Sequence, residues 1–181
     1  GLPNKNKCEE LLSEEEPDAD TGVCSFDLNN LRRINDSRGH EAGDAYIRRF
    51  AICLRASMPA EQFVGRAGGD EFLAVTHGLD REQMTQCLEK VRRDMREESK
   101  VYPDTPLSYA AGFALAGDFP GSTMRELFNC ADKNMYINKN HVKREEAAAE
   151  KHHGYQLLKL LNQHGSNFSD CLYCDARMDT Y

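Results

Sequence analysis

The chain has 181 residues, of which 40% are hydrophobic, enough for one domain with a sizeable core. Its 30 acidic side chains outnumber the 23 basic ones and give a formal charge of −7 at neutral pH. This balance argues against a nonspecific binder of nucleic acid unless basic residues cluster locally. We therefore expect no nucleic-acid partner, whereas a small charged ligand held with a metal ion stays compatible with the composition.

Seven cysteines, an odd number scattered along the chain, do not form the disulfide framework of a small secreted protein. Reduced thiols in the cytoplasm fit better. The sequence has no run of about 18 apolar residues and no charged-then-apolar leader, so we expect this fragment neither to span a membrane nor to carry a signal peptide. The opening residues "GLPN" suggest a piece cut from a longer protein, which could itself be a membrane-bound sensor.

The first half of the chain predicts a helix, a strand, a helix and a hairpin. A short helix is predicted over 5–12, followed by the solvated acidic connection "SEEEPDADTG". The run "VCSFDL" (23–28) predicts a buried strand ending in Asp27, a costly place for a carboxylate unless it is exposed or paired with a cation. In "AGDAYIRRFAICLRASM" the apolar residues recur at helical spacing. The β-rich runs 62–66 and 72–76 predict a tight hairpin.

The second half predicts two capped helices with a strand between them. The segment "LDREQMTQCLEKVRRDMREE" has Asp80 and Gln83 at capping-box spacing, and "STMRELFNCADKNMYINKN" has Thr123 and Glu126 at the same spacing. Between them, "PLSYAAGFALA" (106–116) predicts a strand and its turn. Because the central hairpin forces at least one antiparallel pair of strands, we expect a mixed α/β protein, specifically one of the α+β class. Its helices should cover the faces of an antiparallel or mixed sheet.

The C-terminal region, 145–181, is predicted to be a helical extension followed by a loose tail. "EEAAAEKHHGYQLLKLLNQHG" has helix-forming composition, and "SNFSDCLYCDARMDTY" loses all periodicity. A zinc site on Cys171 and Cys174 would need two further ligands, for which His152, His153 and His164 are near enough in sequence. The favoured alternative to a zinc site is a solvent-exposed tail. A separate possibility is that the helical extension contacts another output module.

Carboxylates at two strand ends point to metal-dependent phosphate chemistry. Asp27 ends one strand, while Asp70 and Glu71 follow the paired glycines Gly68 and Gly69. If those strands are neighbours, the three carboxylates repel one another unless a hard cation such as Mg2+ bridges them. The glycines would let a triphosphate approach bare backbone amides, as in two-metal nucleotidyl transfer. The alternative is a plain hairpin whose carboxylates face water.

Five short motifs occur in order: "GLPN" (1–4), "FDLNNLRRIND" (26–36), "GHEAGD" (39–44), "GRAGGDEF" (65–72) and "ADKNMYINK" (131–139). Together they resemble the GGDEF domain of bacterial diguanylate cyclases, over residues 1–144. The resemblance implies a mostly antiparallel, five-stranded sheet flanked by helices, like the palm of nucleotide cyclases. It also implies that two GTP molecules, one on each of two facing domains of a homodimer, condense to cyclic di-GMP and two pyrophosphates under the control of an upstream sensory domain.

The same resemblance implies roles for individual residues at the phosphate end of the substrate. Asp27 and Asp70 would bind Mg2+, helped by the Leu28 carbonyl, and Glu71 would be a further metal ligand or would help to deprotonate the 3′-hydroxyl. Two Mg2+ ions are expected in each active site, with Mn2+ as an alternative. Gly68 and Gly69 would contact the substrate through their backbone.

Guanine and the outer phosphates have their own implied contacts. Asn35 and Asp44 occupy the guanine-reading positions, and a carboxylate can accept from the N1 hydrogen and the exocyclic amine of guanine. The alternative for Asp44 is an N-cap of a helix beginning near Ala45. Lys139 and Lys143, four residues apart on one helical face, match the basic pair that grips phosphates, although the family usually has Arg at the second position. Arg32 occupies another usual Lys position near the phosphates.

Two departures from the family pattern matter. Asn29 replaces a common Asp near the metals, and "PAEQ" (59–62) lacks the RxxD product-inhibition motif, so inhibition through that site is not expected. The leading hypothesis is a competent diguanylate cyclase. The alternative is a catalytically degenerate module that binds GTP or a partner protein as a regulatory receptor.

Overall fold

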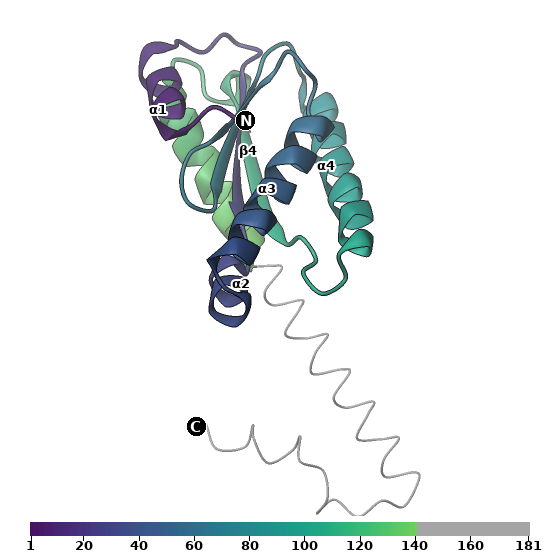
Figure 1. Ribbon diagram of the computed structural model, residues 1–181. Helices are drawn as coiled ribbons and strands as arrows, with labels where there is room; N and C mark the ends of the chain where they lie inside the picture. The colour runs from purple at the N-terminus through teal and green to yellow at the C-terminus, as the bar shows by residue number, and fades with distance from the viewer. Residues whose placement is uncertain (141–181) are drawn as a thin grey trace, which may run out of the picture. The chain divides into compact units, whose positions relative to one another are not determined.

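Four antiparallel strands form the central sheet of the computed structural model, which describes residues 1–140 (Figure 1). Their spatial order is β2 (Phe63–Arg66), β3 (Glu71–Thr76), β1 (Gly22–Leu28) and β4 (Tyr109–Leu115), and every neighbouring pair is antiparallel. The predicted α+β architecture is confirmed, but the sheet over these residues has four strands rather than the expected five. Each strand-like run of residues 1–140 became a strand, whereas the fifth strand rested on the family resemblance alone.

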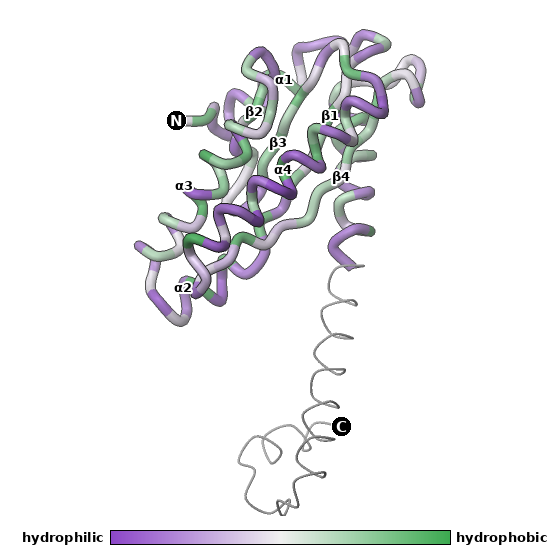
Figure 2. Tube along the Cα trace, turned by 90° about the vertical axis from the view of Figure 1, so that its right-hand side faces the viewer, coloured by the Kyte–Doolittle hydropathy of each residue, from purple (hydrophilic) through white to green (hydrophobic). Residues whose placement is uncertain are grey.

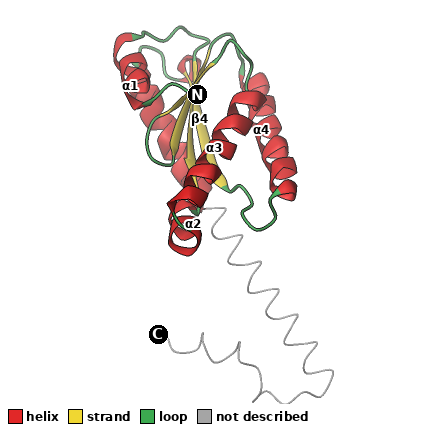
Figure 3. Ribbon diagram, viewed as in Figure 1, coloured by secondary structure: helices red, strands yellow, loops and turns green. Residues whose placement is uncertain are grey.

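Helices cover both faces of this sheet (Figures 1 and 3). On one face lie α2 (Leu31–Arg38), α3 (His40–Ser57) and α4 (Arg81–Val101). On the other lie α1 (Lys5–Glu14) and a helix that starts at residue 124 and runs to 140, the last described residue, here called the terminal helix. The 3-10 helix η1 (Ala116–Asp118) follows β4. The predicted extension over 145–181, with its CxxC pair and histidines, lies outside the described residues.

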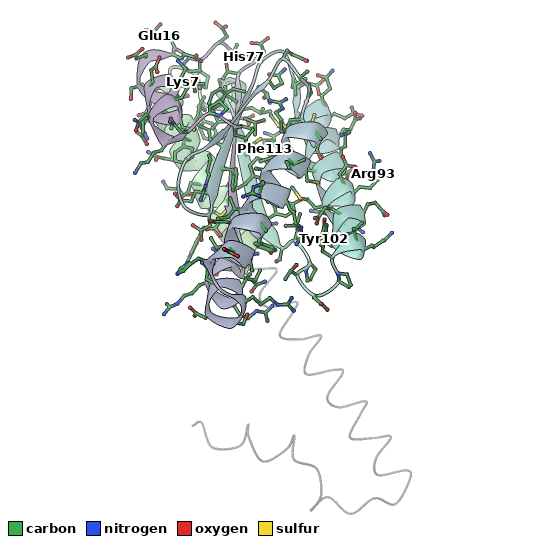
Figure 4. The ribbon with its side chains drawn as sticks, in the orientation of Figure 1. Lys7, Glu16, His77, Arg93, Tyr102 and Phe113 are labelled. Atoms are coloured by element: carbon green, nitrogen blue, oxygen red, sulfur yellow. The ribbon has the colours of Figure 1, made fainter. Side chains whose placement is uncertain are left out.

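The alternation of side chains along the strands divides the core into two clusters. In β1, Cys24 and Phe26 pack with residues of α3 and α4, whereas Val23 packs with residues of α1 and the terminal helix. Figure 2 shows that β1 and β3 are mostly hydrophobic, whereas α4 alternates between hydrophobic and hydrophilic positions. Figure 4 places Glu16 and Arg93 at the periphery, where both are exposed. None of the helices within residues 1–140 is both long and apolar enough to cross a bilayer.

The predicted capping boxes are present at both helix starts. Asp80 and Gln83 make the two reciprocal bonds at the start of α4. At the terminal helix, the Thr123 N–H donates to Oε2 of Glu126 at 2.8 Å, and the Glu126 N–H donates to Oγ1 of Thr123 at 3.2 Å. The helix α3 behaves differently from the alternative weighed for Asp44. It begins at His40 after an N-cap glycine, so Asp44 lies inside the helix and the N-cap interpretation is wrong.

The terminal helix lies very close to β4 because Gly112 has no side chain. A Cβ at Gly112 would lie 2.1 Å from the backbone nitrogen of Met135 and 2.5 Å from the carbonyl oxygen of Ala131. Nδ2 of Asn134 donates to the carbonyl of Phe113 at 2.9 Å. These contacts fix the position of the helix over the sheet, and therefore the place from which its last basic residues can act.

Candidate active site

The ends of β1 and β3 bring the predicted carboxylates to one edge of the sheet. Asp27 and Glu71 are direct partners across the two antiparallel strands, and the Leu28 N–H donates to the carbonyl of Asp70 at 2.8 Å. Directly opposed residues project their side chains to the same face of a sheet, so Asp27 and Glu71 share one face. The two strands are therefore neighbours, which is the condition on which the expected meeting of the carboxylates depended.

The diglycine turn between β2 and β3 is held from two sides. The N–H groups of Ala67 and Gly68 both donate to the carbonyl of Glu71, at 2.9 and 3.1 Å. The Arg66 guanidinium donates through Nε to the carbonyl of Gly68 at 3.0 Å and through Nη2 to that of Gly69 at 2.7 Å. The turn is therefore closed by two backbone bonds and is also bound by the Arg66 side chain.

The two glycines leave room for neighbouring groups rather than adopting an unusual backbone conformation, because neither has a positive φ. A Cβ at Gly68 would lie 2.5 Å from Oε2 of Glu71, so the carboxylate of Glu71 lies against this glycine. At Gly69 a Cβ would meet nothing within 4 Å, so this position is open to an approaching ligand.

Lys139 reaches this edge from the terminal helix. Its Nζ lies 2.6 Å from Oδ1 of Asp27, and the two side chains are only 23% and 16% exposed. A carboxylate at the end of a buried strand needs a cationic partner, and Lys139 supplies it. Lys143, the other half of the predicted basic pair, lies outside the described residues.

The carboxylates fit a hard divalent ion by their chemistry, because carboxylate oxygens and the Leu28 carbonyl are the donors that Mg2+ prefers. Within residues 1–140, however, no three His, Cys, Asp or Glu side chains are gathered as a ready metal site. Two of the carboxylates have other neighbours. The ammonium of Lys139 lies on Asp27, and the carboxylate of Glu71 lies against Gly68.

A cavity of about 750 Å3 opens beside the diglycine turn. This volume falls in the usual range for small-molecule sites, about 300–1,000 Å3. Its lining combines the turn, one face of α3 and the start of the chain: Leu2, Asn4, Lys5, Asp44, Ile47, Arg48, Ala51, Arg66, Gly68, Gly69 and Phe72. Asp44 is exposed and belongs to this lining, and its guanine-reading role stays a prediction.

Two other predicted substrate-binding residues, Asn35 and Arg32, do not line this cavity. Asn35 from α2 lies against α3, where a Cβ at Gly43 would lie 1.9 Å from its Oδ1, so it is adjacent in space to the residue before Asp44. Asn35 itself does not line the cavity. Arg32 is not brought there either: its side chain is 96% exposed and lies 3.7 Å from a carboxylate oxygen of Asp36.

A chain of hydrogen bonds joins the end of β1 to α3. The Asn29 N–H donates to the carbonyl of Ser108 at 2.8 Å, and its Nδ2 donates to Oγ of Ser108 at 3.1 Å. The Ser108 N–H donates to the hydroxyl of Tyr46 at 3.0 Å, which in turn donates to the carbonyl of Pro106 at 3.1 Å. Burial raises the pKa of the Tyr46 hydroxyl, so it stays protonated as a donor. The amide that replaces the family's Asp at 29 is thus held by Ser108, the residue just before β4.

Sequence reasoning missed two arginines that the fold brings to the site. Arg48 lines the cavity one helical turn after Asp44, and the i,i+4 spacing would have placed both on one face of α3. Arg66 stands two residues before the diglycine pair, but its bonds to the turn carbonyls leave no sequence signal beyond its position. The contribution of Leu2, Asn4 and Lys5 to the cavity wall was also not predicted.

Comparisons with known proteins agree with this fold. The family model for the diguanylate cyclase GGDEF domain matches residues 1–145. The cyclic di-GMP phosphodiesterase PdeR of Escherichia coli (strain K12) is 28% identical over 143 residues, which cover 77% of this chain and 22% of PdeR. The chain therefore spans about a fifth of that relative's length.

Solved structures share the fold. The GGDEF domain of TpbB (YfiN) from Pseudomonas aeruginosa aligns with a TM-score of 0.64 at 28% identity, covering 77% of this chain and 86% of that one. An EAL/GGDEF domain protein from M. capsulatus aligns with a TM-score of 0.62 at 26% identity, covering 74% of this chain and 88% of that one.

Proposed function

This chain belongs to the GGDEF domain family, and from that premise we propose that it is a catalytically competent diguanylate cyclase domain. It joins two GTP molecules into cyclic di-GMP and releases two pyrophosphates. The observation that carries the proposal is the edge of the sheet where Asp27 pairs with Glu71 and Leu28 bonds to Asp70. The diglycine turn next to this edge lines a cavity of nucleotide size, although the carboxylates themselves do not line it.

The carboxylates supply the binding sites for two Mg2+ ions, with Mn2+ as an alternative. Such ions, when bound, polarise the phosphate under attack and stabilise the leaving pyrophosphate. Asp27, Asp70 and the Leu28 carbonyl hold them, and Glu71 is a further ligand or accepts the proton of the attacking 3′-hydroxyl. For Asp27 to serve, Lys139 must leave it, and the outer phosphates of the substrate offer its ammonium a new anionic partner.

Recognition of the base comes from α2 and α3. The exposed carboxylate of Asp44 accepts hydrogen bonds from the N1 hydrogen and exocyclic amine of guanine, a donor pair that adenine lacks. Asn35, held beside Gly43, contacts the same base. Gly68 and Gly69 let the phosphates approach the backbone, and Lys143 with Arg32 adds positive charge to the outer phosphates once nucleotide is bound.

Each domain holds one GTP, so two copies must face each other for the reaction. We place the domain in the cytoplasm, where GTP is available and the free thiols of Cys8, Cys24, Cys53, Cys87 and Cys130 stay reduced. An upstream sensory domain controls how often the two copies meet.

A second candidate is a degenerate GGDEF module that binds GTP or a protein partner and makes no product. One contact favours it: the ammonium of Lys139 sits on Asp27, which the cyclase needs as a metal ligand. The likeness to PdeR, which bears the name of a phosphodiesterase, is consistent with a regulatory use of the domain.

Product formation separates the two candidates. The protein is incubated at high concentration with GTP and Mg2+, and cyclic di-GMP and pyrophosphate are measured by chromatography and mass spectrometry. Asp70→Ala should abolish product, whereas Asp104→Ala, at a carboxylate whose side chain is 80% exposed, should leave it intact. Saturable GTP binding without product, even after forced dimerisation, would establish the receptor instead.

A further inference from the structure

We propose that Arg66 is a positioning residue that sets the diglycine turn so that two consecutive N–H groups, those of Gly69 and Asp70, face the phosphates of the substrate. The inference rests on the proposed nucleotide site and deepens it. Its starting point is the pair of bonds from one guanidinium, Nε to the Gly68 carbonyl at 3.0 Å and Nη2 to the Gly69 carbonyl at 2.7 Å.

One guanidinium holds two successive carbonyls on the same side of the turn. Its donors are fixed in a planar fork, so both bonds can be met only when the two carbonyl oxygens of Gly68 and Gly69 point toward Arg66 together. A side chain with a single mobile donor would tolerate many other orientations of these peptide units. The fork therefore fixes backbone orientation at a place where glycine alone would leave it free.

Peptide geometry then determines where the N–H groups point. In a planar trans peptide the carbonyl and the N–H of the next residue point in opposite directions. With the carbonyls of Gly68 and Gly69 turned to Arg66, the N–H groups of Gly69 and Asp70 point away from it. Successive N–H groups that point the same way attract anions.

The backbone N–H groups of the turn fall into two pairs, one that closes the turn and one that is left for a ligand. The N–H groups of Ala67 and Gly68 donate to the carbonyl of Glu71. Among residues 1–140 the N–H groups of Gly69 and Asp70 have no acceptor. Gly69 also has open space where a side chain would be, and it lines the cavity. A triphosphate in the cavity is the anion that these two donors fit.

Arg66 also lines the cavity, so a direct cationic contact with phosphate is the competing explanation. Lysine distinguishes the two, because Arg66→Lys keeps the positive charge and loses the fork. The substitution also spares the link between β2 and the start of the chain, since that link is the backbone bond from the Arg66 N–H to the Pro3 carbonyl at 2.8 Å.

The experiment measures binding of a non-hydrolysable GTP analogue with Mg2+, together with amide NMR shifts of Gly69 and Asp70. We expect both amides of the wild type to shift on binding. In Arg66→Lys and Arg66→Gln we expect both shifts to disappear and affinity to fall about tenfold or more, the loss of at least one charge-assisted hydrogen bond. Arg93→Lys, at an exposed position on α4 (Figure 4), is the matched control and should bind as the wild type does.

Rescue provides a readout that a merely structural role would not move. Methylguanidinium added to Arg66→Ala should restore affinity, whereas methylammonium at the same concentration should not. Wild-type affinity and amide shifts in Arg66→Lys would overturn the inference, as would a failure of the Gly69 and Asp70 amides to respond in the wild type. That second result keeps the test decisive even if the variants fold poorly.

None of these readouts requires turnover, so the inference and the proposed function can fail separately. If the wild type makes no cyclic di-GMP but its two amides respond and the lysine variant loses the response, the cyclase proposal fails and the inference stands. If the wild type makes product and Arg66→Lys makes it equally fast, the inference alone is refuted.

Discussion

Replacing Gly43 by alanine should weaken GTP binding without weakening the fold. Gly43 lies in α3, where alanine normally stabilises a helix by about 0.5–1 kcal/mol relative to glycine. The new Cβ, however, would lie 1.9 Å from Oδ1 of Asn35 and 2.8 Å from its Cγ. Restoring an ordinary contact of 3.4 Å moves the amide of Asn35 back by about 1.5 Å.

The cost falls on Asn35 rather than on the backbone, because the clashing atoms are the far end of a short side chain. A displaced Asn35 loses the proposed hydrogen bond to the base, which contributes about 0.5–1.5 kcal/mol, so affinity for GTP should fall about 2- to 13-fold. The free energy of unfolding should stay within about 1 kcal/mol of the wild type, since the helical gain offsets the local repacking.

Equilibrium binding of GTP with Mg2+ and thermal unfolding by circular dichroism measure the two quantities. Asn35→Ala should lower the affinity by a similar factor, and the double variant should be no weaker than either single one, because both changes remove the same contact. Wild-type affinity in Gly43→Ala, alongside a clear loss in Asn35→Ala, would refute the reasoning.

Three further predictions follow from the packing. Gly112→Ala drives a Cβ into the backbone of the terminal helix, so we expect a loss of about 1–3 kcal/mol in urea unfolding, and an unchanged midpoint would contradict the close approach. Lys139→Met leaves Asp27 without its cation and should cost about 1–3 kcal/mol at neutral pH, partly restored by millimolar Mg2+, whereas Asp27→Asn should show no Mg2+ effect. Cys24 is fully buried and its pKa is raised to about 12 by desolvation, so iodoacetamide at pH 8 should spare it in the native protein and label it in urea.

Local patterns in the sequence were enough to predict most of the fold. The buried, strand-forming run of 23–28 and the capping box at Asp80 are short-range signals, and both appear in the structure where they were expected. The start of α3 was placed too late, because glycine at 39 caps that helix through backbone geometry that leaves no polar side chain to recognise. The fifth strand had no local pattern behind it.

Residues of the candidate site could be predicted where the pairing of strands determines their position. They could not be predicted where a side chain contacts a residue far away in the sequence. The neighbourhood of Asp27 and Glu71 follows from the pairing of β1 with β3. Lys139 was expected on phosphate but lies on Asp27, a contact across 112 positions of sequence that depends on how the terminal helix seats on Gly112. The fork of Arg66 likewise depends on the turn it binds, which no spacing rule describes.

Because the ammonium of Lys139 lies on Asp27, a metal ion that binds Asp27 as proposed must replace one positive charge with another. Without a divalent ion, the ammonium of Lys139 already neutralises Asp27 at this edge of the sheet. The affinity of Asp27 for a divalent ion then depends on how much more strongly the ion binds this carboxylate than the ammonium of Lys139 does. A substrate that draws Lys139 toward its own phosphates shifts that difference, so nucleotide and metal should enter as partners rather than one after the other.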